Sequence, residues 1–303
     1  MAALNPLRPL ARRAPGPLDG LLELWNAALG DASVLVDGLP GESVDAWDPE
    51  HIRRTLPIMS AAFSAYFRPE VRGLEHIPAD GPALLVGNHS GGLYIADTFV
   101  FTIAFYERFG PQRRFHQLAH DLIARMPGLG GLRRYGTVAA SPENARAAME
   151  RDAPVLVYPG GDHETFRPSW EAGRIDFAGR QGFVRLALEQ GVPIVPVVAS
   201  GGQETALFVA RGGRAARLLG LDRLARVKVL PISIGPPFGL NVLDFPGRVP
   251  LPAKITVQVL PPIDVRARFG PDAEPQRVYE QVTGDMQVAL DALEDERSLP
   301  LVG

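Results

Sequence analysis

Short apolar runs alternate with longer helical segments through the middle of the chain. Residues 83–87 (ALLVG), 155–158 (VLVY) and 194–199 (IVPVVA) are typical of strands, because short apolar runs that end at turn residues favour extended structure. Residues 142–151 and 181–191 lie between such runs and have helical spacing. Strands that alternate with helices of this length predict an α/β fold with a mostly parallel central sheet flanked by helices.

Three longer helices are predicted around that sheet. Asp48 as N-cap and Pro49 as first residue begin one that runs to Phe67, since both residue types favour a helix start. Residues 91–109 are apolar nearly all round, so we expect a helix that starts near Gly91 and is buried or lies against lipid. Residues 275–298 predict an amphipathic helix that covers the sheet.

The C-terminal third is less regular. Residues 225–240 and 253–265 predict two more strands. The start of the chain is Pro-rich, with a short amphipathic helix expected at 18–30. We therefore divide the chain into an N-terminal extension, residues 1–47, that is partly loose, and one domain, residues 48–303.

Composition removes several classes of function. The 303 residues carry a net charge of -3, which gives no overall nucleic-acid footprint. The chain has no Cys, and this excludes disulfides, thiolate nucleophiles and Cys-ligated zinc. Nearly all its basic residues are Arg, which can grip phosphate bidentately.

The hydropathy pattern bears on location. The first residues lack the continuous apolar stretch and small-residue cleavage site of a signal peptide. No run reaches the eighteen or so apolar residues of a spanning helix. We expect a protein without a signal peptide or spanning helix, at most bound peripherally at the cytoplasmic face of a membrane.

Two strands run directly into glycine-bearing polar loops. The first loop is NHSGG, residues 88–92, and the second is PGGDHE, residues 159–164. The carboxyl ends of parallel strands share one edge of a sheet, where ligands bind, so both loops are expected there. Glycines let a ligand approach the backbone, and N–H groups at a helix start favour anions.

His89 and Asp97 are candidates for one functional pair. With a helix from Gly91, Asp97 would lie about two turns along and could fold back onto one imidazole nitrogen. A carboxylate there would fix the tautomer and stabilise the imidazolium. The alternative is that His89 only caps the helix and Asp97 is an internal polar residue. Local physics alone leaves both interpretations open.

NHSGGLYIAD, YPGGDHETFRP and VPIVPVV, in this order, resemble the lysophospholipid/glycerolipid acyltransferase superfamily. The resemblance covers Val71 to Ile263 and is strongest to the diacylglycerol-acyltransferase-like branch. Each motif alone is weak, but three in order at strand ends make a fairly specific signal.

The resemblance implies an enzyme that moves a fatty acyl group from acyl-CoA to a glycerolipid hydroxyl at a membrane surface. His89 would be the general base and Asp97 its partner. Backbone N–H groups of Gly91, Gly92, Gly160 and Gly161 would stabilise the oxyanion. No cofactor, metal or covalent intermediate is implied, and acyl-CoA would be the co-substrate. The substrate-binding residues implied are Asn88, Ser90, Gly91, Gly92, Pro159, Gly160, Gly161, Glu164 and Arg167.

The chain departs from the superfamily pattern in two places. The usual Asp would stand at position 94, which is Tyr here, and Asp97 follows about one helical turn later. The usual Pro-Glu-Gly-Thr-Arg block is replaced, with His163 at the Arg position. Without that phosphate grip the acceptor is expected to be neutral, such as diacylglycerol, unless Arg167 or Arg174 substitutes.

Two other functions are compatible with the same residues. A serine hydrolase or thioesterase would use Ser90, although the Gly-x-Ser-x-Gly elbow is not matched. A lipid-binding protein without activity would keep the fold alone. His116 and His120, four apart on an expected helix, are weak metal candidates because no Glu-bearing signature accompanies them.

Overall fold

The computed structural model describes residues 44–92, 94–120, 130–218, 229–242, 244 and 248–297. The predicted N-terminal extension and its short helix lie outside the described residues, except for 44–47, which begin with a 3-10 turn, η2 (Val44–Ala46).

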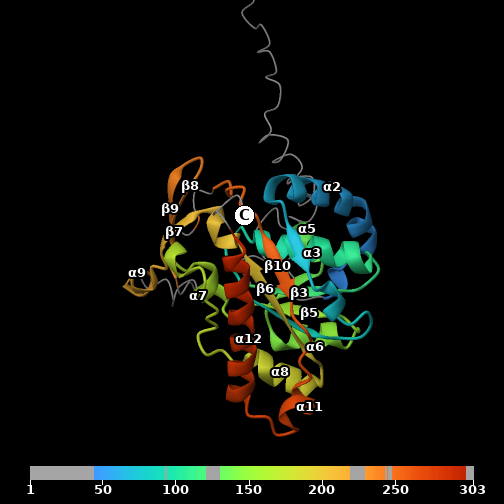
Figure 1. The fold of residues 1–303 in the computed structure, drawn as a ribbon. Helices are drawn as coiled ribbons and strands as arrows, with labels where there is room; N and C mark the ends of the chain where they lie inside the picture. Colours follow the sequence, from blue (N-terminus) through green and yellow to red (C-terminus); the bar gives the residue numbers. More distant parts are fainter. Residues whose placement is uncertain are drawn as a thin grey trace, which may run out of the picture.

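A seven-stranded sheet forms the centre of the fold (Figure 1). The strand order is β1-β10-β6-β2-β5-β3-β4, and the last five of these are mutually parallel, whereas β10 and β1 run the other way. The mostly parallel sheet flanked by helices is therefore confirmed. The strands are β1 (Glu70–Arg72), β2 (Leu84–Gly87), β3 (His116–Ala119), β4 (Thr137–Ala139), β5 (Val155–Val157), β6 (Ile194–Ser200) and β10 (Thr256–Val259).

Helices cover both faces of this sheet, because its strands are apolar on both sides. On β2, Leu85 faces a core shared with α2 and α3, whereas Leu84 and Val86 face a core shared with α6, α8 and α12. The longer helices are α2 (Pro49–Phe67), α3 (Ala96–Phe109), α6 (Pro142–Met149), α8 (Gly182–Gln190) and α12 (Pro275–Asp295). The short ones are η3 (Leu74–His76), α5 (Gly130–Arg134), α7 (Gly161–Thr165), η4 (Ser169–Glu171), η5 (Gly202–Thr205), α9 (Gly213–Leu218) and α11 (Val265–Phe269).

The predicted helix starts are confirmed at α2 but not at α3. Asp48 caps α2 by accepting from the N–H groups of Glu50 and His51. The helix α3 begins at Ala96, five residues later than predicted, and is buried along most of its length. The reason is local: Gly91 and Gly92 have φ of 95° and 70°, which no α-helix accommodates. The chain therefore turns before it enters α3.

A second, three-stranded sheet lies beside the main one, at the upper left of Figure 1. It contains β7 (Leu207–Ala210), β8 (Ile232–Gly235) and β9 (Gly239–Val242), all antiparallel. The strand predicted over 225–240 is thus a hairpin, and β7 was not predicted. Phe208, Ser233 and Asn241 point inward and are fully buried.

His116 lies on strand β3 rather than on a helix, so the spacing to His120 is not the helical spacing a shared metal would need. Its Nδ1 hydrogen-bonds the Gly136 carbonyl oxygen at 3.1 Å. Its Nε2 is buried without a partner among the described residues. Burial lowers the pKa of His116 from 6.5 to about 4, so the ring is neutral at pH 7.

This buried histidine predicts a pH-dependent stability. The unfolded chain binds a proton at His116 below about pH 6.5 and the folded chain only below about 4. The free energy of unfolding should therefore fall as the pH drops through that window, by up to about 3 kcal/mol. We expect urea unfolding at pH 7 and pH 4.5 to show a smaller fall for His116→Gln. An equal fall in both proteins would contradict the prediction.

Candidate active site

The two glycine-bearing loops meet at one edge of the main sheet, as their strand positions predict. Strands β2 and β5 are parallel neighbours, with Val86 opposite Val157. The loops that follow them are joined by two hydrogen bonds: the His89 N–H donates to Glu164 Oε2 at 3.3 Å, and the Gly92 N–H donates to the Thr165 oxygen at 3.1 Å. The geometry around His89 is therefore set by both loops.

Asp97 lies in the first turn of α3 and is bonded to the His89 loop. Its Oδ2 is 3.3 Å from His89 Nδ1 and accepts the Ser90 N–H at 3.0 Å. Its Oδ1 accepts the Thr98 N–H at 2.7 Å. Because a carboxylate only accepts, this contact is a hydrogen bond when His89 Nδ1 carries a proton. The predicted His–Asp contact is thus present, reached through the turn at Gly91 and Gly92.

The imidazole is held from a second side by Tyr158, at the end of β5. The two rings stack at a centroid distance of 4.2 Å and an interplanar angle of 20°. The Tyr158 hydroxyl accepts from Thr98 Oγ1 at 2.8 Å. Burial raises the pKa of Tyr158 well above its usual value, and the Asp97 carboxylate adds to this. A Cβ on Gly87 would stand 2.6 Å from the Tyr158 ring, so a glycine is required there.

Glu164 connects the second loop to its surroundings. Its Oε1 accepts from Arg167 Nη2 at 2.5 Å and from the Asp176 N–H at 3.0 Å, while Oε2 accepts the His89 N–H. The side chain folds over Gly160, where a Cβ would approach Glu164 Cγ to 2.2 Å. Burial raises the pKa of the Glu164 carboxyl, against the opposing attraction of Arg167. Glu164 therefore holds the His89 backbone in place through the hydrogen bond from the His89 N–H.

Arg167 does not present its guanidinium to a ligand in this structure. The residue is only 2% exposed, and its Nε donates to the Glu164 carbonyl oxygen. Its Nη1 donates to the Arg174 carbonyl oxygen and its Nη2 to the Glu164 carboxylate. All three nitrogens have partners, so the expected phosphate-gripping substitute is an internal ion pair here. Arg174 is exposed.

Asn88 and Ser90 also have internal partners. The Asn88 amide donates to the Ala199 carbonyl oxygen and accepts the Ala199 N–H, both at 2.8 Å, which continues the pairing of β2 with β6. Ser90 Oγ donates to Asp97 Oδ2 at 3.4 Å. Both residues are buried. Their contacts orient the loop.

Two of the four expected oxyanion donors have partners. The Gly161 N–H donates to the Tyr158 carbonyl oxygen at 3.0 Å, and the Gly92 N–H to that of Thr165. Among the described residues, no carbonyl oxygen accepts from the N–H of Gly91 or Gly160. The carbonyl oxygens of Pro159 and Gly160 accept from Arg180 Nη1, which fixes the second loop.

The sequence did not point to the ion pair between Arg248 and Asp244. Both side chains are buried, with 3.2 Å between Arg248 Nε and Asp244 Oδ1. Arg248 Nη2 donates to the Gly91 carbonyl oxygen at 2.5 Å, and its guanidinium lies over the Tyr94 ring at 5.0 Å. Tyr94, at the position of the usual superfamily Asp, thus packs on an arginine that holds the His89 loop.

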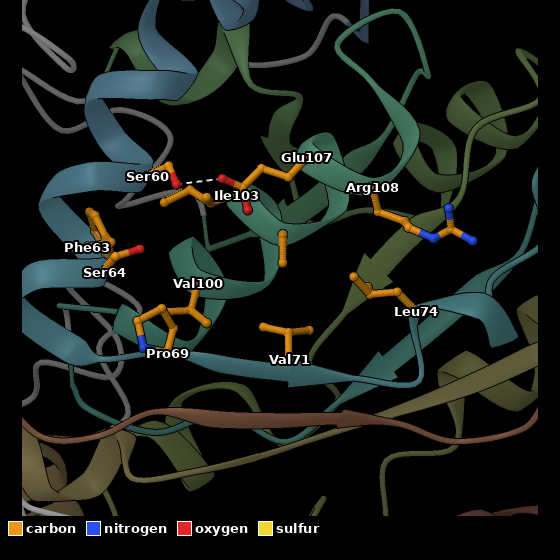
Figure 2. A pocket seen from close by; sticks show the side chains of 11 residues that line it. Ser60, Phe63, Ser64, Pro69, Val71, Leu74, Val100, Ile103, Glu107 and Arg108 are labelled. Atoms are coloured by element: carbon orange, nitrogen blue, oxygen red, sulfur yellow. Dashed lines mark hydrogen bonds between the residues drawn. The ribbon is translucent and has the colours of Figure 1, made fainter.

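A groove of about 400 Å³ with a mixed polar and apolar lining runs between α2, α3 and β1 (Figure 2). Val100, Ile103 and Ala104 of α3 line one wall. Ser60 of α2 donates to Glu107 of α3 across it, at 2.5 Å. Val100 lies one turn after Asp97, so the groove borders the helix that carries the His89 partner.

Two properties of the described ranges bear on location and metal binding. None of their helices has the length and apolarity needed to cross a bilayer. Within those ranges, no three His, Asp or Glu side chains gather as they would to hold a metal ion.

Parts of the chain are similar to known proteins. Residues 68–200 match the family model for acyltransferases. An uncharacterised protein of Mycobacterium tuberculosis is 29% identical over 91% of this chain and 77% of its own length. The human "DGAT1/2-independent enzyme synthesizing storage lipids" is 30% identical over 42% of this chain and 38% of its own. The fold is similar to that of the 1-acyl-sn-glycerophosphate acyltransferase PlsC of Thermotoga maritima, with a TM-score of 0.53, 18% identity and 83% of each chain covered.

The ion pair of Glu164 with Arg167 gives a test of the role of Arg167. Arg167→Met should lower the free energy of unfolding by about 3–5 kcal/mol, because it leaves a buried carboxylate unpaired. The double variant Glu164→Gln/Arg167→Met removes that charge and should recover part of the loss. Urea denaturation measures both. A stable Arg167→Met with only a raised KM would instead indicate contact with substrate.

Proposed function

We propose that the protein moves a fatty acyl group from acyl-CoA to a hydroxyl of a glycerolipid, and the match of residues 68–200 to the acyltransferase family model supports this. The observation that carries this proposal is the contact of His89 Nδ1 with Asp97 Oδ2 at the carboxyl edge of the sheet. That contact leaves Nε2 as a base beside the two glycine-bearing loops.

In the proposed reaction, His89 Nε2 takes the hydroxyl proton while the oxygen attacks the thioester carbonyl carbon. The tetrahedral oxyanion that forms accepts hydrogen bonds from the N–H groups of Gly91 and Gly160. Collapse of the intermediate breaks the C–S bond, and the imidazolium returns its proton to the leaving thiolate. The products are the lipid ester and free CoA. Asp97 stabilises the imidazolium in between.

A neutral acceptor fits the loop best. Arg167 is held by Glu164, and Arg180 is held by Asp162 and by two carbonyl oxygens of the loop. The human relative is named for the synthesis of storage lipids. We therefore propose diacylglycerol or a similar lipid alcohol as acceptor.

The serine hydrolase alternative is disfavoured by one contact. Ser90 Oγ donates to Asp97, and the His89 ring turns its Nδ1 to that same carboxylate. A nucleophilic serine would instead need its hydroxyl bonded to the base. A lipid-binding protein without activity has no need of a His–Asp contact supported from both loops.

Replacing His89 tests the proposal. With oleoyl-CoA and dioleoylglycerol, we expect His89→Ala to lower kcat by about 10²–10⁴-fold, and His120→Ala, an exposed histidine at the end of β3, to leave it unchanged. The chain has no cysteine, so a thiol reagent reports released CoA without background. Unchanged turnover in His89→Ala would refute the proposed role, as would CoA release that does not depend on the acceptor.

Replacing Ser90 separates the two enzyme classes. Ser90→Ala removes a hydrogen bond to Asp97 worth about 0.5–1.5 kcal/mol, so we expect at most a tenfold loss of acyl transfer. A hydrolase that used Ser90 would lose nearly all activity and would be labelled there by a fluorophosphonate probe. Mass spectrometry of the labelled chain decides between the two outcomes.

A further inference from the structure

The peptide group that joins Gly91 and Gly92 is bonded at both of its polar atoms. Its carbonyl oxygen accepts from Arg248 Nη2 at 2.5 Å, and its N–H donates to the Thr165 carbonyl oxygen at 3.1 Å. The two glycines have φ of 95° and 70°, and glycine adopts several backbone conformations at similar cost. The turn alone therefore does not select the orientation of this peptide, and the two bonded partners do.

The Arg248 side chain is itself fixed on several sides. Its Nε lies 3.2 Å from Asp244 Oδ1, and its Nη1 donates to the Thr205 carbonyl oxygen at 3.2 Å. The guanidinium lies 5.0 Å from the ring centroid of Tyr94 and 5.1 Å from that of Phe208, within the range of cation–π attraction. All three guanidinium nitrogens have partners inside the protein, so none of them is offered to a ligand.

The ion pair packs directly on the turn. Asp244 Oδ1 also accepts from Ser233 Oγ at 2.9 Å. Its Oδ2 lies 2.3 Å from where a Cβ on Gly92 would stand, so a glycine is required at that position. Arg248 reaches Gly91 from 157 positions later in the chain. The conformation of the turn therefore depends on a distant segment.

Stability alone does not account for this buried pair. Two buried charges lose their hydration, and apolar side chains of similar volume often stabilise a protein as well or better. The planar guanidinium adds what apolar side chains lack, which is directed donors to three acceptors. The turn that it contacts separates His89 from Asp97, and the Gly91 N–H is a proposed oxyanion donor. The orientation of the turn bears on both.

We propose that Arg248 is a positioning residue for the acyl transfer described above, and the inference rests on that proposed function. Held by Asp244, the guanidinium selects the orientation of the peptide that follows Gly91. That orientation sets how Asp97 meets His89 and where the oxyanion donor lies. Because the guanidinium is buried and fully bonded, it contacts neither the acyl donor nor the acceptor. Its loss should therefore lower kcat and leave KM nearly unchanged.

Steady-state kinetics with oleoyl-CoA and dioleoylglycerol test this role. Arg248→Lys keeps the charge beside Asp244, but an ammonium group does not reproduce the planar fork. We expect kcat to fall by about 10–100-fold and either KM to change by less than about threefold.

A double variant separates positioning from stability. Arg248→Met/Asp244→Asn removes both charges, so its urea midpoint should lie close to that of the unchanged protein, while its kcat stays at least about tenfold lower. The matched control is Arg297→Met. The Arg297 side chain is 8% exposed and also bonds a carboxylate and a carbonyl oxygen, those of Glu204 and Lys254, but not the turn. We expect its kcat to be unchanged.

Three results would overturn the inference. The first is a double variant with the kcat of the unchanged protein, since the pair would then only stabilise the fold. The second is an Arg248→Lys variant with a raised KM and an unchanged kcat, which would indicate contact with substrate. The third is an equal loss of kcat in Arg297→Met, because the effect would then not depend on the turn.

Amide hydrogen exchange separates this inference from the proposed reaction. By mass spectrometry, residues 84–92 should exchange at least about tenfold faster in Arg248→Lys than in the unchanged protein, whereas α12 should exchange at the same rate in both. Faster exchange together with no acyl transfer by the unchanged protein would remove the proposed function and leave Arg248 as the residue that orients the turn. Acyl transfer by the unchanged protein, with equal exchange in both proteins, would remove only the inference about Arg248.

Discussion

The buried carboxylate of Glu164 joins three segments that are distant in the sequence. It receives the His89 N–H from the first loop, the Asp176 N–H from a later one, and Arg167 from the turn that follows α7. A carboxylate shielded from water is tolerated only when its lone pairs are satisfied in this way. Glu164 therefore fixes the backbone of His89 from the side away from Asp97 without contacting the imidazole ring.

Three other polar side chains near His89 also bond to groups inside the protein. Asn88 extends the pairing of β2, Ser90 bonds Asp97, and Arg167 neutralises Glu164. Pre-organised polar groups inside a packed shell fix a site more firmly than flexible surface side chains do. What remains for a substrate is the free side of the imidazole, glycine backbone and apolar surface.

Much of the fold follows from local patterns in the sequence. The mostly parallel sheet, the cap of α2 at Asp48 and the meeting of the two loops all depend on strand ends and caps that short stretches encode. The start of α3 was predicted five residues too early, because the apolar pattern begins near Gly91 whereas the positive φ of Gly91 and Gly92 delays the helix to Ala96. The direction of β10 and the ion pair of Arg248 with Asp244 depend on contacts between distant segments, so no short stretch of sequence predicts them.

The turn at Gly91 and Gly92 has a consequence for how sequences with this pair of side chains are identified. Because the chain loops before α3, Asp97 reaches His89 across eight positions, and Tyr94 is released to pack on Arg248. A search string that demands histidine and aspartate five positions apart would pass over this chain, although the two side chains meet in space. A search for the distance between the two side chains in space would find this chain, whereas a search for their spacing in the sequence would not.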